Sequence, residues 1–268
     1  MRVGVYIRRV LSRIHGGPEE LAQRLADLGV SEVIFGAIWQ DDAFTARRQV
    51  MNSIEVLEEY GLACLAAGMS PGLWGYPAPF IKKTNFISTI GSLLEMQGGD
   101  LWDLVLTDPE KPYKGHHKEL VTHSQSLRRI CQAACTPLGA TTYGVPRWHD
   151  GPRGLEYQHM TDPCLYDFVS PQFYVAENSM VTLGLQDWRA LADDRREPLQ
   201  VDPSVPAYGP NSGAALPGYV RHMRDTCQDL GLAMGTVYIW SDVQLLGKEP
   251  GTRKHLHRVI DIDSTDPK

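Results

Sequence analysis

The chain has 268 residues, of which 43% are hydrophobic, so it can bury one large core. Its formal net charge of -6 gives no reason to expect nucleic acid or an anionic membrane as a partner. Its five cysteines have no paired short spacings, which argues against both a disulfide framework and a zinc site.

The N-terminal segment does not have the pattern of a secretory signal. Arg8 and Arg9 interrupt the first apolar run too early for a secretory signal. No segment is long and apolar enough to span a membrane. We therefore expect a protein that is cytoplasmic as synthesised, or one that is released or delivered to a cell wall by a route that uses no such signal.

Short apolar runs alternate with amphipathic stretches along the chain. Helical spacing predicts helices over 18–28, 116–135 and 219–230, and one around Ile87 to Leu94. A further helix is expected to end at Gly61, which makes 62–69 a strand and the Pro- and Gly-rich stretch 70–79 a loop. The predicted strands, in chain order, are 3–7, 33–39, 62–69, 104–106, 138–143, 168–175, 199–205 and 234–240.

Eight strand-plus-helix units without a Gly-rich phosphate loop predict an α/β fold, a closed (β/α)8 TIM barrel rather than a doubly wound sheet. The chain shows no linker, internal repeat or low-complexity tract, so residues 1–268 are expected to form a single domain. In such a barrel the functional residues gather at the C-terminal ends of the strands.

The fourth strand ends in two carboxylates, Asp108 and Glu110. They are two residues apart, so both side chains leave the same face while the backbone stays extended. Two neighbouring carboxylates repel each other when both are ionised, which tends to keep one protonated near neutral pH. Acid catalysis requires such a proton, so this pair is the predicted catalytic centre.

Aromatic and polar residues follow the other strands. Aromatic rings stack on the apolar faces of a sugar, and amides and carboxylates bind its hydroxyls. The strand ends therefore predict a carbohydrate site. Besides the carboxylate pair, its candidate residues are Trp39, Tyr143, Trp148, Gln172, Tyr174, Asp202, Trp240 and Asp242.

Three segments resemble a known family. Residues 103–110 read D-L-V-L-T-D-P-E, which is similar to the first, sixth and eighth positions of the motif D-G-x-D-x-D-x-E. Residues 167–174 are similar to D-x-V-x-x-Q-F-Y, and residues 235–241 to G-x-x-x-x-W-S. Together they resemble the family 18 glycoside hydrolases, the chitinase and chitinase-like lysozyme barrels. Leu106 stands in place of the middle aspartate, and the likeness covers strand ends only, as in a distant relative or a neighbouring barrel family.

The resemblance implies a retaining, substrate-assisted mechanism. Glu110 would protonate the glycosidic oxygen and later activate water. The 2-acetamido oxygen of the substrate would attack the anomeric carbon, while Asp108 orients that group and Tyr174 donates a hydrogen bond to it. Trp240 would lie under the sugar being cleaved, and Gln172 would bind a hydroxyl or the acetamido group. No metal or cofactor is implied.

The leading interpretation is thus a glycosidase that acts as a monomer on a polysaccharide containing N-acetylglucosamine, peptidoglycan or chitin. A catalytically inactive barrel that binds a glycan or a protein is the first alternative, and Leu106 and Pro109 favour it. A family 25-type lysozyme also places D-x-E on strand four, but the aspartate usual at the end of its strand one is missing here. Metal-dependent hydrolysis ranks third, because His116 and His117 lack the spacing of a metal motif.

Overall fold

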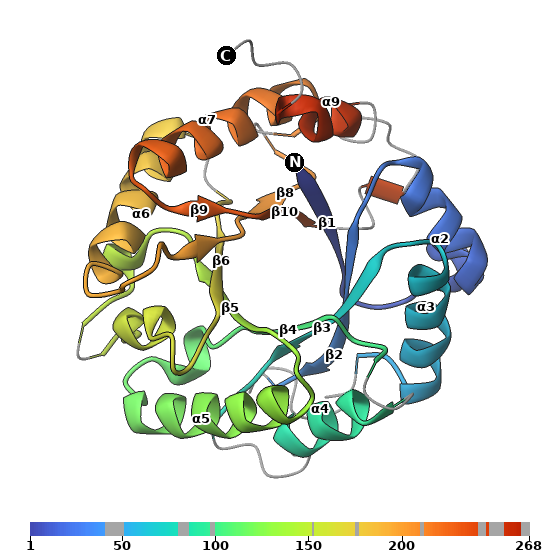
Figure 1. Ribbon diagram of the computed structural model, residues 1–268, viewed down its shortest axis with the longest axis horizontal. Coiled ribbons are helices and arrows are strands. Elements are labelled where there is room, and N and C mark those ends of the chain that lie inside the picture. Colours follow the sequence, from blue (N-terminus) through green and yellow to red (C-terminus); the bar gives the residue numbers. More distant parts are fainter. Residues whose placement is uncertain are drawn as a thin grey trace.

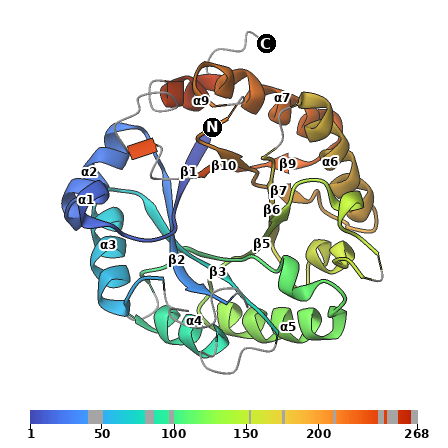
Figure 2. The ribbon, with the colours of Figure 1, turned by 180° about the vertical axis from the view of Figure 1, so that it is seen from behind.

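The computed structural model describes residues 1–40, 51–79, 86–96, 100–151, 153–174, 177–209, 212–240, 245–246 and 255–263. Parallel strands form the inner wall of a barrel, and helices form an outer ring around it (Figures 1 and 2). The strands are β1 (Arg2–Ile7), β2 (Glu32–Trp39), β3 (Ser70–Tyr76), β4 (Leu104–Thr107), β5 (Leu138–Tyr143), β6 (Phe168–Gln172), β7 (Gln200–Val201), β8 (Ser204–Pro206), β9 (Ala233–Met234) and β10 (Thr236–Trp240). The helices are α1 (Ser12–His15), α2 (Pro18–Asp27), α3 (Ile54–Ala66), α4 (Phe86–Leu94), α5 (His117–Ala133), α6 (Asn178–Leu191), α7 (Leu216–Asp229) and α9 (Leu256–Ile260). Short 3-10 helices are η3 (Lys111–Tyr113), η4 (Pro146–Trp148), η5 (Tyr157–Thr161), η6 (Gly213–Ala215) and η8 (Asp261–Asp263).

Strand pairing closes the barrel. β1 to β6 pair in chain order, β6 pairs with both β7 and β8, and β8 pairs with β10, which returns to β1. All these pairs are parallel, so β7 with β8 fills the seventh position of the barrel and β9 with β10 the eighth. The predicted (β/α)8 fold is confirmed.

Alternation along each strand divides the buried side chains between two cores. One lies between the strands and the helices and contains most of the aliphatic residues. The other fills the barrel and is mainly aromatic; its members are Tyr6, Ile34, Trp74, Tyr76, Leu104, Leu106, Phe168 and Tyr238, with Trp39, Met51 and Trp240 packed against them. Residues that continue the inward alternation past a strand end therefore face the mouth of the barrel.

The third strand is the clearest error of the sequence prediction. Residues 62–66, predicted as strand, continue α3, whose N-cap Ser53 accepts a hydrogen bond from the backbone N–H of Val56 at 3.3 Å. Gly61 does not end this helix but lets it approach Trp102, whose ring would lie 3.0 Å from a Cβ at that position. The stretch predicted as a Pro- and Gly-rich loop is β3. Gly75 leaves room there for Phe86, which a Cβ would meet at 2.3 Å.

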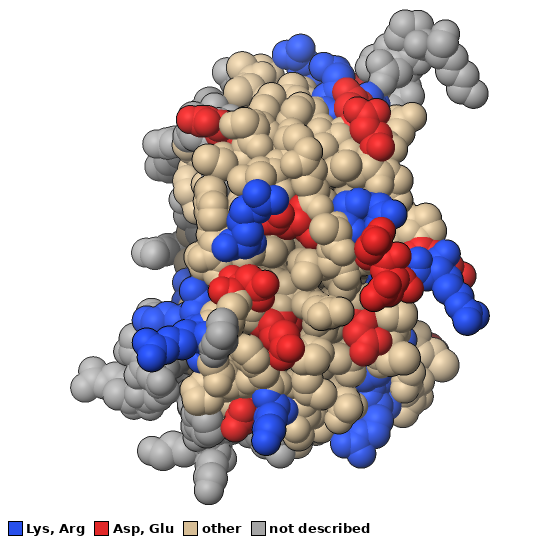
Figure 3. Space-filling model, turned by 90° about the vertical axis from the view of Figure 1, so that its left-hand side faces the viewer, with Lys and Arg blue, Asp and Glu red and all other residues tan. Residues whose placement is uncertain are grey.

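The outer surface mixes the two signs of charge. On the side seen in Figure 3, Lys and Arg side chains lie beside Asp and Glu side chains rather than in separate fields. Two ion pairs of α6 follow this pattern, Arg189 with Asp193 and Arg147 with Asp187. Within the described ranges, no helix combines the length and apolar character needed to cross a bilayer.

Candidate active site

The end of β4 presents the two predicted catalytic carboxylates. Leu104 and Leu106 point into the barrel and Val105 packs against the helices. Asp108 continues the inward alternation and is only 4% exposed. The backbone N–H of Glu110 then donates to the Asp108 carbonyl at 3.0 Å, so the chain turns at Pro109, and the charge of Glu110 acts on Asp108 from beyond this turn. Both therefore lie at the C-terminal mouth of the barrel, where the functional residues of this fold gather.

Asp108 is held from the neighbouring strands. The side-chain amide of Gln172, at the end of β6, donates a hydrogen bond to Asp108 Oδ2 at 3.1 Å. Asp108 Oδ1 is buried, and no described group meets it with full hydrogen-bond geometry. Burial, followed by the negative charge of Glu110, raises the pKa of Asp108 well above its ordinary value, and the side chains of Gln172 and Trp74 oppose this shift.

Glu110 is in the state that a general acid needs. Burial raises the pKa of its carboxyl group to about 8, and the positive charge of Lys114 acts in the opposite direction. Glu110 Oε1 is buried, and no described group forms a hydrogen bond to it. A carboxyl group with this pKa carries its proton at neutral pH and can give it to a bound leaving group.

Tyr143, at the end of β5, forms the wall beside Glu110. Its ring stacks on His149 with centroids 3.8 Å apart, and Lys114 Nζ lies 5.0 Å from its centroid. Lys114 Nζ and His149 Nδ1 are 3.0 Å apart, within hydrogen-bond distance. Burial, and then the charges of Glu110 and Asp108, raise the pKa of Tyr143 to about 12, so its phenol stays neutral and can donate a hydrogen bond.

Aromatic rings form the floor of the mouth. Trp240, at the end of β10, contacts Tyr6 and Trp74 with centroid distances of 5.3 and 5.4 Å. Trp74 also contacts Trp39 at 5.6 Å, and Trp39 stacks on Tyr76 at 4.4 Å with an interplanar angle of 10°. These rings join the ends of β1, β2, β3 and β10 into one platform beside the carboxylates.

Tyr174 follows β6 at the boundary with solvent and is 38% exposed. Although the residue as a whole is exposed, the atoms packed around its phenol disfavour the phenolate and raise its pKa well above the ordinary value, and the charges of Tyr6, Asp108 and Glu110 add to this shift. Because Asp108 and Glu110 act on its pKa, Tyr174 lies within electrostatic reach of both. The structure thus brings together Asp108, Glu110, Tyr143, Gln172, Tyr174, Trp39 and Trp240.

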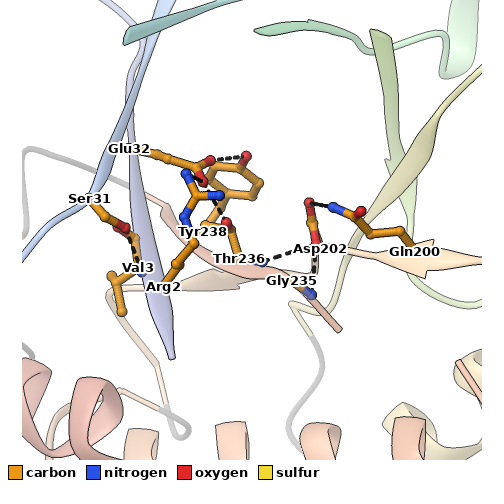
Figure 4. Close-up of polar contacts among 9 residues, drawn as sticks. All are labelled: Arg2, Val3, Ser31, Glu32, Gln200, Asp202, Gly235, Thr236 and Tyr238. Carbon is orange, nitrogen blue, oxygen red and sulfur yellow. Dashed lines mark hydrogen bonds and ion pairs between the residues drawn. The ribbon is translucent and has the colours of Figure 1, made fainter. Parts of the chain in front are cut away.

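Asp202 does not belong to this group, which corrects the sequence prediction. Its Oδ1 accepts hydrogen bonds from the backbone N–H groups of Gly235 and Thr236, both at 3.0 Å, where β10 begins (Figure 4). This is the N-terminal end of the barrel, opposite the carboxylate pair. The seventh strand is interrupted at Asp202 and Pro203, so the aspartate precedes β8 instead of following it.

A polar cluster surrounds Asp202 at that end. Glu32, only 3% exposed, accepts hydrogen bonds from Thr236 Oγ1 and the Tyr238 hydroxyl, both at 2.6 Å, and pairs with Arg2 at 2.5 Å (Figure 4). At the N-terminal face of a (β/α)8 barrel, such residues ordinarily contribute to stability. The cluster lies at a cavity of about 590 Å³.

For two further predicted residues the structure shows no contact with this group. Trp148 lies in η4 and is 51% exposed, and its neighbour Arg147 is paired with Asp187 of α6. Asp242 falls outside the described residues. Among the residues that the structure describes, no three His, Cys, Asp or Glu side chains are arranged to hold a metal ion.

Sequence reasoning missed several residues at the mouth. Tyr6 and Trp74 are inward-facing residues of β1 and β3, and Trp74 was overlooked because the third strand was predicted too early in the chain. Lys114 and Tyr157 come from connecting segments, where no periodicity signals which way a side chain points. Tyr157 is fully buried, and the charge of Glu110 contributes to raising the pKa of its phenol, after the larger effect of burial.

Comparisons with known proteins support the fold. The structure is similar to an endo-β-1,4-mannanase from Thermotoga petrophila, with a TM-score of 0.65 and 9% identity over 100% of this chain and 78% of the mannanase. It is similar to a GH18 chitinase from Pseudoalteromonas aurantia, with a TM-score of 0.58 and 12% identity over 90% of this chain and 94% of the chitinase. It is also similar to a xylanase and α-amylase inhibitor protein from Scadoxus multiflorus, with a TM-score of 0.62 and 12% identity over 97% of this chain and 98% of the inhibitor.

No protein-family model matches the chain, and a search of curated proteins finds no relative. At identities of 9 to 12%, the structural likeness shows the fold alone. That fold is a (β/α)8 barrel shared with glycoside hydrolases and with a protein named as an inhibitor.

Proposed function

We propose that the chain is a retaining glycoside hydrolase that cleaves a polysaccharide containing N-acetylglucosamine, either peptidoglycan or chitin. The observation that carries the proposal is the pair of the buried Asp108 and the half-buried Glu110 at the mouth of the barrel, where desolvation raises the pKa of Glu110 to about 8. It acts as a monomer and uses no cofactor.

In the proposed reaction Glu110 gives its proton to the glycosidic oxygen as the bond to the anomeric carbon breaks. The acetamido carbonyl oxygen of the same sugar bonds to that carbon and forms a cyclic oxazolinium ion. Glu110, now a carboxylate, takes a proton from a water molecule that attacks the anomeric carbon, so the ring opens with retained configuration. Asp108, held by Gln172, orients the acetamido group.

The tyrosines and tryptophans supply binding. Tyr174 and Tyr143 are neutral phenols beside the carboxylates and donate hydrogen bonds to the acetamido group or a hydroxyl. Trp240 provides an apolar surface for the sugar ring. These roles follow from position and chemistry together with the resemblance to the family 18 barrels.

The test is reducing-end release from purified peptidoglycan and from chitin oligosaccharides across a range of pH. Glu110→Gln removes the transferable proton while keeping the size of the side chain, so release should be lost. Asp103→Asn is the matched control, because Asp103 is an exposed carboxylate that immediately precedes the same strand. Release that survives Glu110→Gln would exclude Glu110 as the acid.

One observation favours a second function, a barrel that binds glycan without cleaving it. Leu106 is fully buried inside the barrel where the family motif has an aspartate, so Asp108 lacks that proton-sharing neighbour. In this case neither the protein nor its Glu110→Gln variant releases reducing ends, while both bind the glycan with equal affinity.

A further inference from the structure

Arg8 places a positive charge on the aromatic platform of the mouth. It directly follows β1, and its guanidinium carbon lies 4.2 Å from the centroid of the Trp39 ring. Trp39 contacts Trp74, which in turn contacts Trp240, the proposed floor for the sugar being cleaved. Arg8 is therefore two rings away from that floor, about where an adjoining sugar would rest.

The guanidinium of Arg8 is half-buried and has no counter-ion in the part of the chain that the structure describes. Burial accordingly lowers its pKa, and among the described residues no carboxylate opposes the shift. The contact with Trp39 is a cation–π interaction, which compensates only part of the cost of removing a charge from water. The chain has a net charge of -6, so a half-buried cation at a proposed substrate site, without a counter-ion among the described residues, indicates that the site binds an anionic ligand.

The geometry favours a single negative charge as the missing partner. Trp39 covers one side of the planar guanidinium, which leaves its N–H edge to bind a carboxylate through two parallel hydrogen bonds. Lys114, another cation of the mouth, is already within hydrogen-bond distance of His149. One available cation suits a monoanion better than a doubly charged phosphate.

We propose that the substrate is an acidic glycan, in which a sugar next to the cleaved N-acetylglucosamine unit carries a carboxylate, and that Arg8 binds this carboxylate. This proposal rests on the proposed function. A peptidoglycan strand has such a group in the lactyl ether of every second sugar, whereas chitin is neutral. The proposal thus chooses between the two polymers on the charge of Arg8.

The experiment measures binding in the Glu110→Gln background, so that turnover is not required. Peptide-free peptidoglycan strands, in which the sugar carboxylates are the only anions, are compared by calorimetry with the same strands after reduction of the carboxyl groups to alcohols. We expect the native strands to bind about tenfold or more tightly, the size of one charge-assisted contact. High salt should reduce this preference.

Arg8→Gln should abolish the preference, so that the variant binds native and reduced strands with equal affinity, and this remaining binding shows that the variant is folded. Arg9→Gln is the matched control: it makes the same charge change at the next residue, which is exposed, and should keep the preference. A preference that is absent, or that survives Arg8→Gln, overturns the role of Arg8. Binding of neither strand would instead reject the proposed function and this inference together.

Discussion

Asp202→Asn should change how the stability of the protein depends on pH. Asp202 is 3% exposed, and burial raises its pKa from an ordinary 3.8 to about 7, with the charge of Glu32 adding to the shift. Hydrogen bonds from Gln200, Gly235 and Thr236 oppose it. The folded protein therefore binds this proton more tightly than the unfolded chain does.

The sign and size of the pH effect on stability follow from the difference between the pKa of Asp202 in the folded and the unfolded protein. The stabilisation by protonated Asp202 is complete below about pH 4 and is lost as pH rises to about 7. A shift of about three pKa units corresponds to about 4 kcal/mol of unfolding free energy, and the three N–H donors make this an upper limit. Asparagine has no charge to lose. Its carbonyl oxygen can accept the two backbone N–H groups, and a turned Gln200 amide can accept from its NH2 group.

The assay is denaturant unfolding of both proteins from about pH 5 to about pH 8. The wild-type free energy of unfolding should fall more steeply with pH than that of Asp202→Asn, by up to about 2.7 kcal/mol over this range, which covers about two of the three pKa units. Asp103→Asn removes an exposed carboxylate at the same end of the barrel and should follow the wild-type curve. Parallel curves for wild type and Asp202→Asn would refute the reasoning.

Two predictions concern the mouth of the barrel. Activity should decline as pH rises through about 8, where Glu110 loses its proton. Lys114→Met should move this decline to a higher pH by roughly 0.2 to 0.7 units, because the partly screened positive charge of Lys114 no longer stabilises the Glu110 carboxylate. The pH dependence of kcat/KM measures this, Lys111→Met is the exposed control, and a decline that stays in place would contradict it. Asp108→Asn should lower kcat by about a hundredfold with KM little changed, since Asp108 acts on the developing ion; steady-state kinetics that show a raised KM at unchanged kcat would assign it to binding alone.

Much of this protein could be read from local patterns. The fifth strand lies at its predicted residues, 138–143, and the first, second, fourth and sixth within a few residues of theirs, because buried parallel strands leave short apolar runs. The position of Asp108 after an apolar run predicted the mouth of the barrel, which needs only the rule that parallel strands end on one side. The shared face predicted for Asp108 and Glu110 assumed an extended backbone, and the chain turns at Pro109 between them.

Local patterns failed where packing decides the outcome. Gly61 lies within a helix and Gly75 within a strand, since Trp102 and Phe86 occupy the space that their missing side chains leave. Neither partner can be identified from neighbouring sequence, so the third strand was predicted in the wrong place.

The amino-acid sequence by itself determined the barrel and the strand that carries the carboxylates, because the spacing of apolar residues along each segment reports its secondary structure. Only the tertiary structure decided that Asp202 lies at the opposite end and that Lys114 and Arg8 reach the mouth. Those positions depend on residues brought together from distant parts of the chain. Their mutual burial and charge set the pKa values of Asp202 and Glu110, and they leave the Arg8 guanidinium without a counter-ion among the described residues.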